Sequence, residues 1–174
     1  MNIIVAVDKE WGIGNRGQLL MHIREDLRNF ARLTKGKTVI YGSKTLETFP
    51  GKAPLKSRRN IILSRKENLE IENAEIAGSV EKAMELVANV DPEDIFVIGG
   101  GTVYSQFLPF CDCCYVTKIE KSFEKDIYFE NIDADNGWKL VYRSSERQSD
   151  AETDETGGVG FYFTKYRRIK NENS

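Results

Sequence analysis

One carboxylate in this sequence stands where a proton donor could work. Asp26 falls in the first turn of a segment, residues 25–35, that reads as a helix, and the i, i+1, i+4 spacing places Leu27 and Phe30 beside it. A carboxylate that shares a face with apolar side chains and opens to a pocket has its pKa raised by desolvation, which suits a proton donor. The more common role of an acid at this position is to stabilise the helix dipole, and the local sequence leaves both roles open.

Two glycine motifs could serve a phosphate-bearing ligand. Residues 12–17 (GIGNRG) match the dinucleotide pattern GxGxxG, but the preceding strand ends near Asp8 and no helix opens at the third glycine. We therefore interpret this segment as a flexible loop beside a pocket, a candidate lid. Residues 99–101 (GGG) lie between an apolar strand and a helix, so their backbone N–H groups could face a pyrophosphate. A tight strand-to-helix turn is the alternative.

Basic residues follow several expected strands. They are Lys44, Arg58, Arg59, Arg65 and Lys66. Solvated surface is the default interpretation, and recognition of a carboxylate or phosphate by the planar guanidinium is the sharper one.

The supply of histidine and cysteine limits the chemistry further. His22 is the single histidine, so Ser-His-Asp, Cys-His and two-histidine metal sites are disfavoured. Cys111, Cys113 and Cys114 form one short cluster with an odd count, which predicts small apolar residues entering a strand and not a disulfide framework or a zinc site. Carboxylates or a cofactor must then carry any catalysis, with no metal.

The composition is that of one ordinary folded domain. The chain has 174 residues, 40% of them apolar and 30% charged, with a net charge of −2. This length is typical of a single domain, here residues 1–174, and the weakly acidic balance disfavours a nucleic-acid partner. The apolar runs are too short to span a bilayer and no signal peptide is recognisable, so we expect a cytoplasmic protein with no membrane partner.

Strands alternate with helices over the first two thirds of the chain, and the last third is rich in strands. We expect strands at 2–8, 38–41, 60–63, 74–76, 95–98, 114–119, 126–129, 138–143 and 160–166, and helices at 25–35, 44–49, from 79, and 103–108. Residues 144–158 are acidic and polar and read as a mobile hairpin tip. The pattern predicts an α/β domain with a mixed sheet.

In chain order, these pieces resemble dihydrofolate reductases. The resemblance runs from residue 3 to about 166 and rests on six motifs: 6–14 (AVDKEWGIG), 25–30 (EDLRNF), 39–45 (VIYGSKT), 58–65 (RRNIILSR), 97–104 (VIGGGTVY) and 115–119 (YVTKI). It implies a single-domain α/β fold with a mixed, mostly parallel central sheet flanked by helices and an antiparallel C-terminal hairpin. It also implies reduction of 7,8-dihydrofolate to tetrahydrofolate by NADPH, which needs no histidine or metal because the nicotinamide supplies hydride.

The resemblance assigns roles residue by residue. Asp26 matches the acid that assists protonation of the pterin at N5, and Thr117 matches its hydrogen-bond partner. Arg58 matches the arginine that holds the substrate's glutamate carboxylate. The remaining substrate contacts it implies are Ile4, Ala6, Leu27, Phe30, Leu55, Ile98 and Tyr104. The cofactor contacts it implies are Ala6, Ile13, Gly42, Ser43, Lys44, Thr45, Leu63, Ser64, Arg65, Gly100, Gly101, Thr102, Val103 and Tyr104.

The sequence departs from the family pattern at three places. Leu19-Leu20-Met21 stands where the family usually has Leu-Pro-Trp, Arg24 replaces a common proline, and Ser43 replaces a common Arg or Lys. Two alternatives to dihydrofolate reduction stay open: a pterin or pyrimidine reductase of the riboflavin-synthesis type, and a non-catalytic homologue that only binds its ligand. For the leading interpretation, we expect a monomer that binds a small folate substrate.

Overall fold

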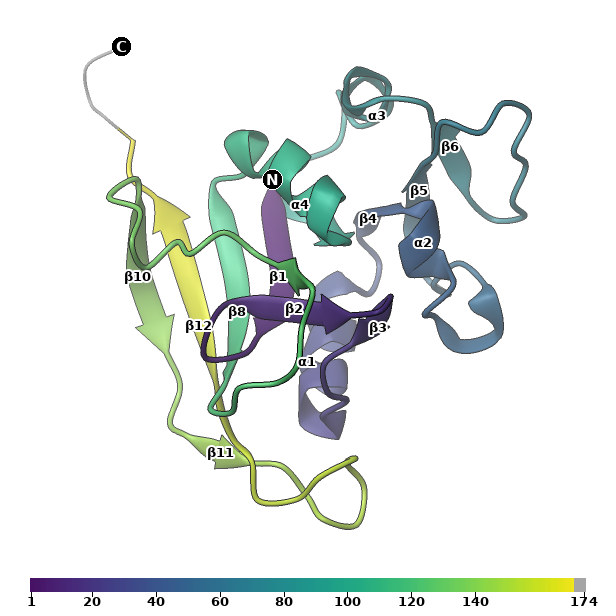
Figure 1. The fold of residues 1–174 in the computed structure, drawn as a ribbon. Helices are drawn as coiled ribbons and strands as arrows, with labels where there is room; N and C mark the ends of the chain where they lie inside the picture. Colours follow the sequence, from purple (N-terminus) through teal and green to yellow (C-terminus); the bar gives the residue numbers. More distant parts are fainter. Residues whose placement is uncertain (171–174) are drawn as a thin grey trace.

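The computed structural model describes residues 1–170, and a single large sheet organises them (Figure 1). The sheet order is β10-β12-β8-β1-β7-β4-β5-β6, with β11 paired to β12. Its strands are β1 (Asn2–Val7), β4 (Thr38–Gly42), β5 (Arg59–Leu63), β6 (Glu75–Ala77), β7 (Ile95–Gly99), β8 (Cys113–Ile119), β10 (Trp138–Arg143), β11 (Arg147–Gln148) and β12 (Gly160–Arg168).

Strand direction divides this sheet into two parts. The strands from β8 through β1, β7, β4 and β5 to β6 pair in parallel, whereas β12 is antiparallel to β8, and β10 and β11 are antiparallel to β12. The expected mixed, mostly parallel sheet with an antiparallel C-terminal hairpin is therefore confirmed.

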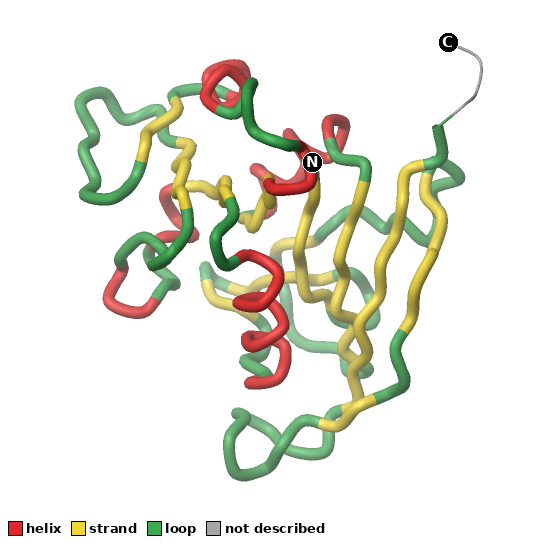
Figure 2. The backbone as a smooth tube through the Cα atoms, turned by 180° about the vertical axis from the view of Figure 1, so that it is seen from behind, coloured by secondary structure: helices red, strands yellow, loops and turns green. Residues whose placement is uncertain are grey.

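Helices cover both faces of the parallel part (Figures 1 and 2). They are α1 (Arg24–Thr34), α2 (Ser43–Leu46), α3 (Val80–Leu86) and α4 (Gly101–Phe107), with short 3-10 turns at Pro50–Lys52, Pro92–Asp94 and Leu108–Phe110. None of the described helices is long and apolar enough to cross a membrane.

The alternation of β1 explains the two layers, because successive side chains of a strand point to opposite faces. Ile3, Val5 and Val7 pack in a core cluster with α3 and α4, whereas Ile4 joins a second cluster that includes Phe30 of α1. Helix α1 therefore lies on the face of the sheet opposite α3 and α4, in front of the strands in Figure 2.

The segment expected to be a glycine-rich loop is instead a small sheet. Strands β2 (Gly12–Asn15), β3 (Gln18–Leu19) and β9 (Ile127–Tyr128) pair in the order β3-β2-β9. A Cβ at Gly12 would lie 2.0 Å from Cδ of Lys125, so this glycine allows close packing. The loop interpretation was wrong because the partner strand lies more than a hundred residues away.

Smaller differences occur elsewhere. Helix α4 begins at Gly101, two residues earlier than expected, because Gly100 takes the extended conformation of an N-cap. Strand β11, inside the expected polar hairpin tip, pairs with β12. Cys113 and Cys114 open strand β8 and are buried free thiols, which confirms the expectation of small apolar residues there.

Candidate active site

The carboxyl ends of four parallel strands lead into segments that the sequence singled out. Strand β1 leads into the hairpin of β2 and β3, β4 into α2, β5 into Ser64, and β7 into α4. In open α/β sheets ligands bind in the crevice outside these strand ends. The candidate site therefore lies along one edge of the sheet, beside α1.

Asp26 and Thr117 meet across this site. The Thr117 hydroxyl donates to Oδ1 of Asp26 at 2.6 Å. Thr117 is buried on β8, and Asp26 is half-buried at the start of α1. Desolvation by burial raises the pKa of Asp26 to about 6, although the hydrogen bond from Thr117 opposes that rise. A carboxyl group with this pKa can hold and release a proton near neutral pH.

A distant loop secures the first turn of α1, which carries Asp26. The residue at the N-cap is Ile23, whose side chain cannot accept a hydrogen bond from the helix. The first N–H of the helix, on Arg24, instead donates to Oδ1 of Asp154 at 2.8 Å. Arg147 forms an ion pair with Glu25, the residue beside Asp26. The sequence analysis did not identify Asp154 and Arg147, because nothing in a polar, acidic loop indicates which helix it contacts.

Most of the apolar residues expected to contact the substrate belong to one hydrophobic cluster. Ile4 and Ile98 belong to one buried cluster, against which Phe30 and Leu55 pack. Leu27 is 46% exposed, so its side chain is open to an incoming ligand.

Ala6 lies in a neighbouring cluster of buried residues. This cluster contains Met21, Ile23, Ile119, Val159 and Phe161. Met21, which stands where the family usually has Trp, is only 7% exposed and is part of this core.

Arg58 is held at the C-terminal end of α1. Its Nε donates to Oγ1 of Thr34 at 3.1 Å, its Nη1 donates to the carbonyl of Lys56 at 2.8 Å, and its guanidinium carbon lies 5.9 Å from the Phe30 ring centroid. Nη2 forms no hydrogen bond within residues 1–170. The guanidinium group therefore keeps one donor group for a ligand.

A buried amide that the sequence analysis overlooked fixes the loop that carries Arg58. Oδ1 of Asn60 accepts from the Tyr41 hydroxyl and from the backbone N–H of Leu55, both at 3.0 Å. Its Nδ2 donates to the carbonyls of Leu55 and Arg58 at 2.9 and 3.1 Å. An asparagine inside the apolar run of β5 was the available signal.

Glycines bring the start of α4 against α2. A Cβ at Gly100 would lie 3.3 Å from Oγ1 of Thr45, and one at Gly42 would lie 3.2 Å from Cγ2 of Val103. The Gly99–Gly100 peptide is cis. Backbone N–H groups are thus exposed between the two helices without side chains to cover them, as a pyrophosphate needs.

A hollow of about 480 Å³ opens where β5 ends. Ser64, Arg65 and Lys66 line it, directly after Leu63. Ser43 and Lys44 belong to α2, where Ser43 is half-buried and Lys44 is exposed, and neither lines this hollow. Among the expected cofactor contacts, the structure thus groups Ser64 with Arg65 but not with Lys44.

Two further expected contacts lie along α4. Thr102 is exposed in its first turn. Tyr104 is buried, and its hydroxyl donates to the carbonyl of Ile4 at 2.8 Å. Burial, followed by the charges of Asp26 and Cys114, raises the pKa of Tyr104. The tyrosine hydroxyl therefore ties α4 to β1 beneath the site.

A buried ion pair anchors the expected lid. Nζ of Lys125 donates to Oδ2 of Asp8 at 2.6 Å, and both side chains are almost fully buried. Burial alone would raise the pKa of Asp8, but the hydrogen bonds from Lys125 and from the backbone of Phe123, Gly12 and Glu10 outweigh it and lower the pKa.

The lid lies against the start of α4. A Cβ at Gly101 would lie 2.6 Å from Cγ2 of Ile127 and 3.9 Å from Cδ1 of Ile13. The expected cofactor contact Ile13 is therefore close to the glycines. Within residues 1–170 no group of three or more His, Cys, Asp or Glu side chains could hold a metal ion.

Comparisons with known proteins agree with this geometry. The model of the family described as "Dihydrofolate reductase" matches residues 1–168. The dihydrofolate reductase of Staphylococcus haemolyticus is 38% identical over 170 residues, 98% of this chain and 96% of the relative. That of Bacillus subtilis (strain 168) is 33% identical over 168 residues, 97% of this chain and 94% of the relative.

A solved structure supports the same assignment. The dihydrofolate reductase from Enterococcus faecalis, complexed with NADP(H) and RAB-propyl, superposes with a TM-score of 0.83 at 29% identity, covering 97% of this chain and 96% of that one. The family model matches almost the whole length of the chain, and relatives more than 30% identical cover it equally well. This chain therefore belongs to the dihydrofolate reductase family.

Proposed function

We propose that this protein reduces 7,8-dihydrofolate to 5,6,7,8-tetrahydrofolate with hydride from NADPH, and that Asp26 assists protonation of the pterin. The observation that carries the role of Asp26 is its 2.6 Å hydrogen bond from Thr117, beside the apolar cluster of Ile4 and Phe30. The family comparisons favour this reaction over the riboflavin-type reductase and over a non-catalytic homologue.

Asp26 supplies the proton that must follow hydride transfer. When hydride reaches carbon 6 of the pterin, negative charge develops at N5 and a proton must arrive there. The pKa of about 6 keeps part of the Asp26 population protonated at neutral pH. Thr117 holds the carboxyl group in place through its hydroxyl, and the surrounding apolar side chains exclude water.

The rest of the substrate follows α1. Phe30, Leu55 and Ile98 contact the pterin and benzoyl rings, with Leu27 closing over them. At the far end of the helix, Arg58 binds the glutamate carboxylate through its free Nη2, and Asn60 positions the loop that carries this arginine.

The chain's residues fit NADPH, which supplies hydride at its nicotinamide ring. Gly42, Gly100 and Gly101 leave room for the pyrophosphate, since a Cβ at each would approach a neighbouring side chain within 3.3 Å. Ser64 and Arg65 bind the 2′-phosphate in the hollow beside β5, where an arginine makes charge-assisted hydrogen bonds.

Contacts along the rest of the cofactor complete the assignment. Ala6 and Ile13 lie at the nicotinamide end. Ser43, Lys44, Thr45, Leu63, Thr102, Val103 and Tyr104 make up the remaining cofactor contacts, with Tyr104 also beneath the pterin.

The direct test is loss of NADPH absorbance with and without dihydrofolate. We expect turnover that depends on dihydrofolate and yields tetrahydrofolate. Thr117→Val should lower kcat by loosening the hold on the Asp26 carboxyl group, whereas Thr38→Val, at a buried threonine that begins β4, should not. Absence of turnover by the folded protein would overturn the proposed function.

The cofactor assignment has a test of its own. Arg65→Gln should reduce the ratio of kcat/KM for NADPH to that for NADH, with kcat for dihydrofolate little changed. An unaltered ratio would remove Arg65 from the 2′-phosphate site.

We further propose a cytoplasmic monomer, folded as one domain over residues 1–174, with no nucleic-acid partner. The three cysteines are buried free thiols, as a reducing compartment favours, and the net charge is −2, which disfavours nucleic acid. Analytical ultracentrifugation of the active enzyme tests the oligomeric state, and a dimer would contradict it.

A further inference from the structure

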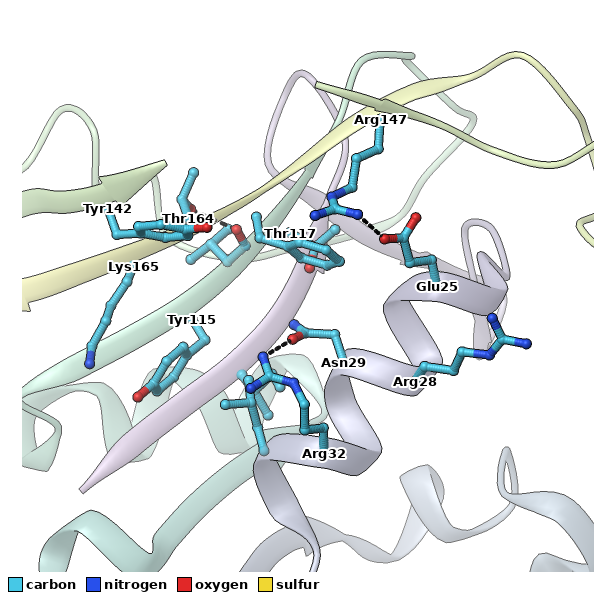
Figure 3. A pocket seen from close by; sticks show the side chains of 14 residues that line it. Glu25, Arg28, Asn29, Arg32, Tyr115, Thr117, Tyr142, Arg147, Thr164 and Lys165 are labelled. Carbon is cyan, nitrogen blue, oxygen red and sulfur yellow. Dashed lines mark hydrogen bonds and ion pairs between the residues drawn. The ribbon is translucent and has the colours of Figure 1, made fainter. Parts of the chain in front are cut away.

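A cavity of about 380 Å³ lies between α1 and the antiparallel part of the sheet (Figure 3). Strands β8, β10 and β12 form its back and α1 its front, with Arg147 of β11 above. Its volume is within the ~300–1,000 Å³ of pockets that bind small molecules. None of the roles proposed above uses this cavity as a binding site.

One stripe of α1 faces the cavity and is polar. Glu25, Arg28, Asn29 and Arg32 follow the i, i+3, i+4, i+7 spacing that places side chains on a single face of a helix. A helix that lies on a sheet normally turns an apolar stripe toward it. Phe30 and Leu33 of α1 do pack against the second core cluster, so the polar stripe is what the helix presents toward the antiparallel strands.

The charges are unbalanced. Arg147 is neutralised by Glu25, the one acid in the lining. Arg28, Arg32 and Lys165 form no ion pair within residues 1–170; Arg32 only donates to the Asn29 amide oxygen at 2.8 Å. Arg32 and Lys165 thus bring two cations without an acidic partner to one cavity; Arg28 also lines it, but its side chain points away from the other labelled groups in Figure 3. Such a field attracts an anion.

Aromatic surfaces line the sheet side of the cavity. Tyr115 of β8 and Tyr142 of β10 line the cavity (Figure 3). Nζ of Lys165 lies 5.0 Å from the Tyr115 ring centroid. A planar group could stack on these rings while its acidic groups meet the arginines, whose forked geometry suits carboxylates and phosphates.

We propose that this cavity is a second ligand site, which binds a small planar organic anion bearing two or more acidic groups. It is separate from the site for the glutamate carboxylate, because Arg58 contacts Phe30 and Thr34 on a different stripe of α1. Thr117 lines the cavity and also donates to Asp26, so an occupant lies directly behind the catalytic acid.

Isothermal titration calorimetry with benzene-1,3,5-tricarboxylate and, separately, inorganic pyrophosphate tests the proposal. Both are titrated into the NADP⁺–folate complex, in which the anion sites of the active site are filled. We expect saturable binding that weakens at least about tenfold in the R28Q/R32Q double variant. The tighter of the two probes identifies the acidic group, carboxylate or phosphate, that the cavity prefers.

The matched control removes two cations elsewhere. Lys139 and Arg167 lie opposite each other on β10 and β12, both exposed, and K139Q/R167Q changes the net charge equally. This variant should bind the probe like the wild type. Equal weakening in both double variants, binding confined to the ligand-free protein, or no saturable binding up to about 10 mM would overturn the site. Dihydrofolate turnover, measured separately, reports on the proposed function and should be unchanged in R28Q/R32Q.

Discussion

Replacing Asp26 by asparagine should make the protein more stable and less active, and both effects should grow as pH rises. Asparagine keeps the shape of the side chain but cannot carry a proton to the pterin. A positioned acid typically contributes ~10²–10⁴-fold to a rate, so kcat should fall by about that factor at neutral and alkaline pH. The deficit should shrink as pH falls, because the substrate then takes its proton from solution.

The stability effect follows from the same pKa. Burial raises the Asp26 pKa from 3.8 to about 6, so the folded protein binds the proton more tightly than the unfolded chain does. The free energy of unfolding therefore decreases as pH rises from about 4 to about 6 and is flat above that. The full difference corresponds to about 3 kcal/mol, at about 1.4 kcal/mol for each pKa unit. Asn carries no such cost, so the variant should gain up to about 3 kcal/mol at pH 8 and almost nothing near pH 4.

Two measurements on the same preparations check this reasoning. Urea unfolding at about pH 4 and pH 8 gives the stability difference, and NADPH absorbance across the pH range gives kcat. The Glu25→Gln variant is the control, since Glu25 is the neighbouring acid in the same helical turn and is paired with Arg147. Near-normal turnover of D26N at alkaline pH, or a D26N protein that is less stable than wild type at pH 8, would refute the argument.

Three further substitutions test the surroundings of the site. Arg58→Lys should raise KM for dihydrofolate about tenfold with kcat little changed, because an ammonium group cannot reproduce the fork; steady-state kinetics with an unaltered KM would contradict this. Gly101→Ala should raise KM for NADPH, because the new Cβ would lie 2.6 Å from Cγ2 of Ile127; an unaltered KM would show that the space at Gly101 is unimportant. Asp154→Ala should remove the cap of α1, lower the free energy of unfolding by about 1 kcal/mol in urea titrations and reduce kcat, and a fully active, equally stable variant would exclude a capping role.

The sequence by itself determined the elements whose patterns are local. The apolar runs of β1 and β7 and the spacing in α1 each depend on residues a few positions apart, and the structure confirms a strand or helix at each. Asp26 was singled out in the same way, because its apolar neighbours sit one and four residues away on the same helix. Thr117 and Arg58 came from the resemblance to a family, since nothing in their own segments indicates a partner.

Only the tertiary structure decided the contacts that join distant segments. Asp154 caps a helix that begins 130 residues earlier, and Lys125 neutralises Asp8 across a separation of 117 residues. Only the fold shows that Glu25, Arg28, Asn29 and Arg32 of α1 line a cavity against the antiparallel strands. Periodicity indicates which face of a helix or strand is apolar. Which elements pack against each other depends on the tertiary fold of the whole chain, and no single segment of the sequence indicates it.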